Sequence, residues 1–370
     1  SLLMLLLAST VPLRGAESAT WQASYHFPSG SLGPLAVHKG FAYVMNAWTR
    51  GDGLMVFDAR RPESLRFVRG VAGNGYLTAW AQAGDVLYIA SRFSLMVVDG
   101  SRPESARVVR NLAFGFPSME VDLLAVSGNC LLVGGRNGGL RLFDITEPLS
   151  PVLAAHHPEV GRLASLAAEE RLVAIQPQGQ DGILATRDGF ALTERARLKT
   201  RGSLRLQDCL LFDTDSRGTT LVDVRDPAAP VAVTNLPGVK PVGPFGTKRM
   251  LAVKPGGELA IIDSSVPGKP VLKGGMALPA DVNPGAMAVE GGRLYVLDTG
   301  RISLRLFDVS GNDAREMGER WVMRNEGIVE LAGRHAIHCY TQNKEMKVLS
   351  LPLRKAGTVD FTSYVSLSLS

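Results

Sequence analysis

The sequence has little cysteine, few aromatic residues and no apolar run long enough to cross a membrane. Three cysteines among 370 residues are too few for a disulfide scaffold, so burial of apolar side chains must hold the fold. Apolar residues make up 45% of the chain, which excludes a disordered protein. A membrane-spanning helix needs about 20 consecutive apolar residues, and no segment approaches that length. We therefore expect a folded chain without a transmembrane segment.

Signatures of common enzymes and metal sites are also missing. The chain contains no G-x-S-x-G, no P-loop and no H-E-x-x-H sequence. The segment Asp213 to Gly218 resembles the start of a calcium loop, but Val224 stands where an EF-hand needs a bidentate glutamate. The net charge is only +5 and no dense basic run occurs, so nucleic acid is not an expected partner. From the sequence we assign no catalytic residue, no metal and no cofactor.

The first residues have the pattern of an export signal. Ser1 to Thr10 read SLLMLLLAST, an apolar run that ends in small residues, and cleavage is expected between Gly15 and Thr20. A buried N-terminal strand or helix is the alternative. We therefore expect residues 1–19 to be a signal peptide truncated at its start, residues 20–364 to form a single domain and residues 365–370 to be a tail. The mature protein is then exported and soluble.

The rest of the chain is a tandem repeat. An apolar run followed by aspartate and a proline-containing turn recurs, as LMVFD ending at Asp58, LMVVD at Asp99 and LRLFD at Asp144 and Asp308. From Asp58 to Asp308 there are six intervals averaging about 42 residues, and an eighth copy ends at Ser350 in place of aspartate. The first two copies share the sequence RPES after the aspartate, which indicates a recent duplication. Repeats of this period indicate stacked supersecondary units.

Each repeat contains four short strands separated by turns, and none shows helical periodicity. Four-stranded repeats of this length predict an all-β fold, a β-propeller in which each repeat is one blade. Residues 35–354 hold eight repeats of about 40 residues, so we expect eight blades. Seven is the alternative, if the degenerate fourth repeat merges with a neighbour. We expect the N-terminal strand 21–27 to complete the last blade and close the ring, with residues 356–361 as the rival strand.

The recurring apolar-Asp phrase, with proline after it, resembles the LVIVD-repeat family of bacterial β-propellers. The matching phrases are Leu54–Asp58, Leu95–Asp99, Leu140–Asp144, Leu259–Asp263 and Leu304–Asp308, and the prolines are Pro62, Pro103, Pro148, Pro227 and Pro267. The resemblance covers about 320 residues. It implies a propeller and a bacterial protein located in the periplasm, outside the cell or on its surface. It implies no particular activity, since the family offers no catalytic residues to transfer.

Two kinds of repeat residue have a structural interpretation. The aspartate that ends the third strand of each repeat is expected to accept hydrogen bonds from backbone N–H groups of the following turn. A ring of metal-binding carboxylates is disfavoured, because successive blades point these aspartates in different directions. Cys130 and Cys209 occupy similar places in non-adjacent repeats, too far apart for a disulfide, and are interpreted as small buried side chains in second strands.

A basic residue occurs in the turn between the second and third strands of seven repeats. These residues are Arg50, Arg92, Arg136, Arg217, Lys254, Arg301 and Lys344. Candidate aromatic or axial residues nearby are Tyr76, Phe116, His156, Trp321, Asp213 and Asp298. A rim of cations with exposed aromatics suits an anionic partner, such as an acidic polysaccharide, an anionic lipid headgroup or an acidic protein. The alternative is that these arginines and lysines only keep the surface soluble.

The sequence is compatible with three functions. We expect a non-catalytic binding or scaffold propeller, exported or displayed at the surface. The alternative is an enzyme with its site at the central channel, either a hydrolase or lyase acting on polysaccharide or a cofactor-dependent oxidoreductase. Asp213 and Asp298 would be its candidate acid and base, because they break the repeat symmetry. A structural module of a larger surface assembly is the third possibility.

Overall fold

The computed structural model divides into two compact units, residues 28–322 and a second unit of residues 1–27 with 323–370. It describes residues 32–46, 51–73, 77–91, 94–114, 121–135, 138–266, 268–300, 303–311, 313–321, 329–332, 335–340, 345–350 and 364–368. These residues form β-strands and three short 3₁₀ helices, and they include no α-helix. Within these ranges no helix has the length and apolarity needed to cross a bilayer. The all-β prediction is confirmed.

The first unit contains seven four-stranded antiparallel sheets in its described residues. The strands of the first four are β1 (Leu32–His38), β2 (Phe41–Asn46), β3 (Gly51–Asp58), β4 (Arg66–Gly73), β5 (Leu77–Ala83), β6 (Val86–Ser91), β7 (Ser94–Asp99), β8 (Arg107–Ala113), β9 (Val121–Ser127), β10 (Cys130–Gly135), β11 (Leu140–Asp144), β12 (Val152–His157), β13 (Leu163–Glu169), β14 (Leu172–Pro177), β15 (Gly182–Asp188) and β16 (Ala191–Leu198). The 3₁₀ helices are η1 (Pro62–Ser64), η2 (Pro103–Ser105) and η3 (Pro158–Val160).

The remaining three sheets of this unit follow in chain order. Their strands are β17 (Ser203–Gln207), β18 (Leu210–Asp215), β19 (Gly218–Asp223), β20 (Val231–Pro237), β21 (Lys240–Pro244), β22 (Arg249–Val253), β23 (Leu259–Asp263), β24 (Val271–Met276), β25 (Pro284–Glu290), β26 (Arg293–Asp298), β27 (Ser303–Asp308) and β28 (Arg315–Trp321). The second unit contains a separate four-stranded sheet, made of β29 (Val329–Ala332), β30 (His335–Tyr340), β31 (Glu345–Ser350) and β32 (Tyr364–Ser368).

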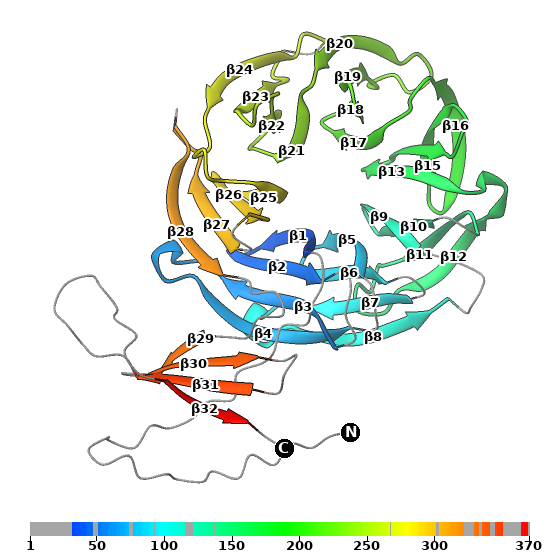
Figure 1. The fold of residues 1–370 in the computed structure, drawn as a ribbon. Helices are drawn as coiled ribbons and strands as arrows, with labels where there is room; N and C mark the ends of the chain where they lie inside the picture. Colours follow the sequence, from blue (N-terminus) through cyan, green and yellow to red (C-terminus); the bar gives the residue numbers. More distant parts are fainter. Residues whose placement is uncertain are drawn as a thin grey trace. The chain divides into compact units, whose positions relative to one another are not determined.

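The seven sheets are the blades of a propeller, numbered here in chain order. The first strand of each blade lies nearest the centre of the ring and the fourth lies at its outer edge (Figure 1). The middle strands are the most apolar because both of their faces are covered by neighbouring blades. Every residue of β6 is buried, whereas β8 at the outer edge of the same blade has no fully buried residue. The apolar phrase that ends in aspartate is therefore a buried middle strand.

The ring closes with seven blades, and the prediction of eight blades in the ring is wrong. The inner strand β1 of blade 1 packs directly against the inner strand β25 of blade 7. The reason given for the alternative of seven was also wrong, because the degenerate fourth repeat forms a complete blade, β13–β16. The eighth repeat is not one of these seven blades, because it forms the separate sheet β29–β32 of the second unit. Its fourth strand is β32, whose residues 365–368 were expected to be a tail. The expected closing strand 21–27 and its rival 356–361 lie outside the described residues.

Hydrogen bonds at the turns between first and second strands join neighbouring blades. At the closing seam, the Glu290 carboxylate accepts the backbone N–H of Lys39 at 3.0 Å and of Gly40 at 2.8 Å. Lys39 has φ of 53° and Gly40 has φ of 72°, so both N–H groups point out of a left-handed turn. Glu169 of blade 4 accepts the same pair of bonds from the β17–β18 turn, at 2.7 and 3.1 Å. The interface between blades 7 and 1 therefore has the same kind of contact as the interface between blades 4 and 5.

The RPES turn of blade 1 strengthens this seam. It forms η1, whose Pro62 is buried and which packs against β28 of blade 7. Gly318 on β28 meets the carbonyl oxygen of Pro62 so closely that a Cβ there would lie 1.9 Å from it. Arg293 of blade 7 also donates to the carbonyl oxygens of Ala59 and Arg60, at 3.3 and 3.4 Å. Blade 1 is thus attached to blade 7 at its inner turn and at its outer edge.

The hydrophobic core consists of clusters that lie between neighbouring blades. Between blades 1 and 2, Val56 and Tyr43 belong to one cluster with Met96 and Val98. Similar clusters fill each interface from blades 2 and 3 round to blades 6 and 7. Because each blade is covered only by its neighbours, the core depends on a closed ring.

We expect Glu290→Ala to lower the free energy of unfolding by about 1–3 kcal/mol, because two backbone N–H groups at the closing seam lose a charged acceptor. Urea unfolding at neutral pH measures the change. The matched control is Glu194→Ala, which removes an exposed carboxylate that pairs with Arg197 on the same outer strand and should cost less than about 1 kcal/mol. Equal losses in the two variants would show that Glu290 has no special part in closure.

Candidate functional site

The aspartate that ends the third strand of most blades shapes the turn that follows it. In six blades its Oδ1 atom accepts the backbone N–H of the residue two positions later, at 2.8–3.1 Å. The aspartates are Asp58, Asp99, Asp144, Asp223, Asp263 and Asp308. This confirms the predicted structural role. Across the described ranges no group of three histidine, cysteine, aspartate or glutamate side chains is placed to hold a metal ion.

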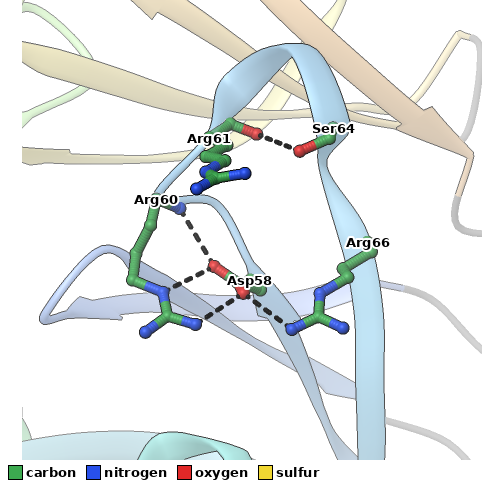
Figure 2. A pocket seen from close by; sticks show the side chains of 5 residues that line it. All are labelled: Asp58, Arg60, Arg61, Ser64 and Arg66. Atoms are coloured by element: carbon green, nitrogen blue, oxygen red, sulfur yellow. Dashed lines mark hydrogen bonds and ion pairs between the residues drawn. The ribbon is translucent and has the colours of Figure 1, made fainter.

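In blade 1 this aspartate also holds two arginines. Asp58 accepts from Arg60 Nε at 3.0 Å and Nη2 at 2.8 Å, and from Arg66 Nη2 at 3.2 Å (Figure 2). The hydrogen bond from Arg60 is the main cause that lowers the pKa of Asp58 to about 2. Arg60 also pairs with Glu104 of blade 2 at 2.9 Å. The carboxylate is therefore ionised at neutral pH and fixes the directions of two guanidinium groups.

A pocket of about 240 Å³ opens inside this turn. It is lined by Asp58, Arg60, Arg61, Ser64 and Arg66. Figure 2 shows Arg60 and Arg66 on either side of Asp58, with Arg61 and Ser64 across the turn from them. The Ser64 hydroxyl donates to the carbonyl oxygen of Arg61 at 3.4 Å, a long and weak bond. Three guanidinium groups and a hydroxyl thus surround one carboxylate.

Blade 2 contains the same pocket in its corresponding turn. This pocket has a volume of about 340 Å³ and is lined by Asp99, Ser101, Arg102, Ser105 and Arg107. The shared RPES sequence explains the likeness, because in both turns a buried proline begins a 3₁₀ helix that places arginine and serine at equivalent positions. Sequence reasoning noted the duplication but missed the site. The detectable signal was the arginine that follows each RPES by two residues.

A bulge in each outer strand adds a further arginine to each of these two blades. In β4, Arg66 pairs with the aspartate that ends β3 and Arg69 pairs with the residue two positions before it, so both lie on one face of the strand. The extra residue of the bulge brings side chains three positions apart to the same face. In β8 the bulge does the same for Arg107 and Arg110. Blades 1 and 2 therefore each carry an arginine pair at the outer edge.

Two of the predicted basic turn residues lie in the described part of the chain. Arg217 has 83% of its side chain exposed and pairs with Asp215 at 2.9 Å, and Lys254 pairs with Glu258 at 2.9 Å. Each of these side chains therefore forms an ion pair with a carboxylate of its own hairpin. The other predicted residues, Arg50, Arg92, Arg136, Arg301 and Lys344, lie outside the described residues.

The predicted aromatic residues do not assemble into a described site. Tyr76 and Phe116 lie outside the described residues, and Trp321 is the last residue of β28. His156 is exposed on the outer strand β12, where its Nε2 atom is 2.7 Å from the carbonyl oxygen of Gly138. This contact holds the His156 ring against its own blade.

The candidate acid and base are each engaged inside their own blades. Asp213 on β18 accepts the N–H of Gly202 at 2.9 Å, and burial raises the pKa of its carboxyl. Asp298 on β26 is fully buried, accepts the N–H of Gly300 at 2.8 Å and pairs with Arg305 at 3.2 Å. Both carboxylates therefore have local structural partners.

Arg305 is the centre of the most highly charged buried cluster described. Its side chain is only 2% exposed and pairs with Glu316 at 2.6 Å, with Asp298 at 3.2 Å and with Asp281 at 3.1 Å. Hydrogen bonding to Glu316 is the main cause that raises the pKa of Arg305. The cluster ties the segment before β25 to three strands of blade 7. Because Arg305 is buried and its guanidinium pairs with three carboxylates, we assign the cluster a structural role.

Cys130 and Cys209 are free and unsuited to nucleophilic chemistry. Cys130 is buried as expected, and burial raises the pKa of its thiol to about 11. Cys209 is only half-buried and lies in the β17–β18 turn with φ of 58°, so its expected place in the second strand was wrong by one residue. Burial also raises the pKa of Cys209. Both groups remain thiols at neutral pH, whereas the thiolate is the nucleophile.

Comparison with known proteins supports the fold and one repeat. Residues 120–156, which cover blade 3 except its last residue, match the LVIVD repeat family model, so the chain contains an LVIVD repeat, as its resemblance implied. No curated protein matches the sequence.

Solved structures resemble the chain in fold. A functionally unknown protein from Desulfotomaculum acetoxidans has a TM-score of 0.55 and 11% identity, over 72% of this chain and 91% of that one. The computationally designed Ika8 protein has a TM-score of 0.53 and 11% identity, over 87% and 98%. Apo AztD from Citrobacter koseri has a TM-score of 0.50 and 14% identity, over 79% and 86%. At these identities the likeness concerns the fold alone.

We expect Arg305→Met to lower the free energy of unfolding by about 3–5 kcal/mol, because Asp298 would remain buried without its cation. Thermal and urea unfolding measure the loss. The double variant Arg305→Met with Asp298→Asn should recover part of it, since the buried charge is also removed. Lys254→Met, which breaks a partly exposed pair with Glu258, should cost less than about 1 kcal/mol. A small loss in the Arg305 variant would contradict the structural role.

We expect acid to destabilise the fold partly through Asp58. Its folded pKa of about 2 lies below the value of about 3.9 in an unfolded chain. A lowered folded pKa contributes stability that is present above pH ~4 and is lost as pH falls through about 2. Asp58→Asn and Arg60→Met should each flatten the fall in unfolding free energy across this range, as measured by urea unfolding at several pH values. An unchanged fall in both variants would refute this.

Proposed function

We propose that this LVIVD-repeat propeller is an exported, non-catalytic binding module whose partner is an acidic polysaccharide. The observation that carries the proposal is the distribution of charge around the outer turns. Blades 1 and 2 bear an excess of arginine there, while the turns on either side of them are acidic. A localised basic surface on an otherwise mixed ring favours an extended anionic partner.

The charge of equivalent twelve-residue segments supports this distribution. Counted from the aspartate that ends the third strand, residues 58–69 of blade 1 contain four arginines and two acids, and residues 99–110 of blade 2 contain three and two. Residues 144–155 of blade 3 contain two acids and no arginine or lysine, and residues 308–319 of blade 7 contain four acids and one arginine. Ring closure places blade 7 beside blade 1, so the basic segment has an acidic neighbour on both sides.

The arginines of this surface are available to a partner. Arg61, Arg66, Arg102 and Arg107 are all exposed. Arg61 and Arg102 have no ion-pair partner among the residues that the structure describes. The outer strands β4 and β8 that carry the bulge arginines lie next to each other (Figure 1). Such uncompensated arginines bind the carboxylate, sulfate or phosphate groups of a polyanion through charge-assisted hydrogen bonds.

The predicted basic turns between second and third strands form a second candidate surface for the same partner. Only Arg217 and Lys254 of that set are described, and both are paired within their hairpins. This favours the turns of blades 1 and 2 over the predicted rim, and a direct comparison of the two surfaces decides between them.

We expect the chain from Thr20 onward to bind acidic but not neutral glycans, with an affinity that falls as salt is raised, because surface charges are screened. Removing four arginines by Arg61→Ala, Arg66→Ala, Arg102→Ala and Arg107→Ala should weaken binding by about tenfold or more. Removing Arg92, Arg136 and Arg301 in the same way should leave it within about twofold of the wild type. A glycan array and calorimetry at low and high salt provide the measurement.

The outcomes separate the hypotheses. Loss of binding only in the variant of Arg92, Arg136 and Arg301 would move the site to the predicted rim. Binding to an acidic protein but to no glycan would show that the partner is a protein and not a polysaccharide. Failure of the wild-type protein to bind any acidic polymer at low salt would overturn the proposal.

A further inference from the structure

We infer that the RPES turns of blades 1 and 2 are two sockets for tetrahedral oxyanion groups, so that the ligand carries repeated sulfate or phosphate esters rather than carboxylates alone. This inference rests on the proposed function and names the chemistry of its ligand. It follows from the donors that surround the two turn pockets, from the weak bonds that those donors now make, and from the difference between the two pockets.

The blade 1 pocket has donors on several sides. Arg66 uses one of its five N–H groups on Asp58, which leaves its other groups for a ligand. Arg61 faces it from across the turn (Figure 2). The Ser64 hydroxyl, which makes only a bond of 3.4 Å to a carbonyl oxygen, can rotate to donate to a ligand. Two guanidinium groups and a hydroxyl therefore surround one space of about 240 Å³.

This arrangement matches three terminal oxygens better than two. A carboxylate is planar, and a single guanidinium fork satisfies both of its oxygens. A sulfate or phosphate monoester presents three terminal oxygens in different directions. Arg61, Arg66 and Ser64 offer one donor group for each of them. The pocket thus offers two donor groups beyond the single fork that satisfies a carboxylate.

The aspartate of the pocket orients the donors and does not exclude an anion. Asp58 is ionised, but hydrogen bonds from Arg60 and Arg66 occupy both of its oxygens. Glu104 from blade 2 also pairs with Arg60. Arg60, Arg61 and Arg66 together with Asp58 and Glu104 therefore carry a net charge of +1. The N–H groups that the two acids do not bind belong mainly to Arg61 and Arg66.

The blade 2 pocket repeats the donors with one cation fewer. Arg102 and Arg107 take the places of Arg61 and Arg66, and the Ser105 hydroxyl again makes a long bond, of 3.3 Å, to a carbonyl oxygen. Ser101 stands in place of Arg60 and donates its N–H to Asp99 at 3.0 Å. No arginine in that position neutralises the aspartate. The residues that line the blade 2 pocket therefore carry a net charge of +1, against +2 for those that line the blade 1 pocket, and we expect the blade 2 socket to bind more weakly.

The test uses calorimetry to compare the affinities of the full-length chain for three polymers of equal charge. The probes are a sulfated oligosaccharide, an oligosaccharide of similar length that carries phosphate monoesters, and a polyuronate that carries only carboxylates. We expect the sulfated or the phosphorylated probe to bind at least about tenfold more tightly than the polyuronate. A phosphate ester gains charge between pH 5 and 7, whereas a sulfate ester does not. If the sockets bind these groups, the affinity for the phosphorylated probe should rise over this pH range and the affinity for the sulfated probe should not.

Variants assign the effect to the sockets. Arg61→Lys with Ser64→Ala keeps the charge but removes the fork and the hydroxyl, and should abolish most of the preference for the sulfated or phosphorylated probe. Ser101→Arg should strengthen binding by supplying blade 2 with the missing cation. Arg197→Lys, an exposed arginine paired with Glu194 on β16, is the matched control and should change binding by less than about twofold. Melting curves verify that each variant is folded.

The outcomes distinguish this inference from the function on which it rests. If all three polymers bind alike and the socket variants behave like Arg197→Lys, the sockets are refuted while a general polyanion-binding function stands. If no polymer binds the wild-type protein, the proposed function and the sockets fail together. If Ser101→Arg fails to strengthen binding although Arg61→Lys with Ser64→Ala weakens it, only the blade 2 socket is refuted.

Discussion

The contact between blade 7 and blade 1 is the constraint on which the rest of the structure depends. A propeller blade buries its faces only against its neighbours, so an open ring would leave two apolar faces exposed. Here the seam is closed by Glu290 binding two backbone N–H groups of blade 1, and by the buried Pro62 packed beside Gly318. No described strand is shared between the first and last blades. Side-chain fit and turn hydrogen bonds hold the ring shut.

The same turns that hold the blades together also explain where function can arise. In most blades the outer turn has the same geometry, and its hydrogen bond is made within the turn, because one aspartate accepts the N–H two residues later. Binding capacity needs donors beyond this pattern. Blades 1 and 2 have them in Arg61, Arg66, Arg102 and Arg107, which the RPES duplication and the following residues provide. The candidate site is thus an addition to the repeat rather than part of it.

Departures from repeat symmetry elsewhere have a different meaning. Asp298 breaks the pattern of the second strands and invites a catalytic interpretation, but its partner is Arg305, a buried cation that two further carboxylates also hold. Charged groups buried in this way require one another, since removing one leaves an uncompensated charge. A symmetry-breaking carboxylate in a propeller is therefore a functional candidate only after its local partners are known.

The amino-acid sequence alone predicts the four-stranded blades, the buried third strands and the turn role of the repeat aspartates, because these follow from local apolar patterns and turn chemistry. It also contained the RPES duplication and the LVIVD resemblance. The folded structure is needed to show that seven blades close the ring, since repeat counting cannot show that β1 packs against β25. It also decided which arginines act together. Arg66 and Arg69 share a face only because a bulge shifts the register of β4, and Arg61 lines one pocket with Arg66 only through the fold of the turn. Such non-local fit depends on packing, which no pattern along the chain records.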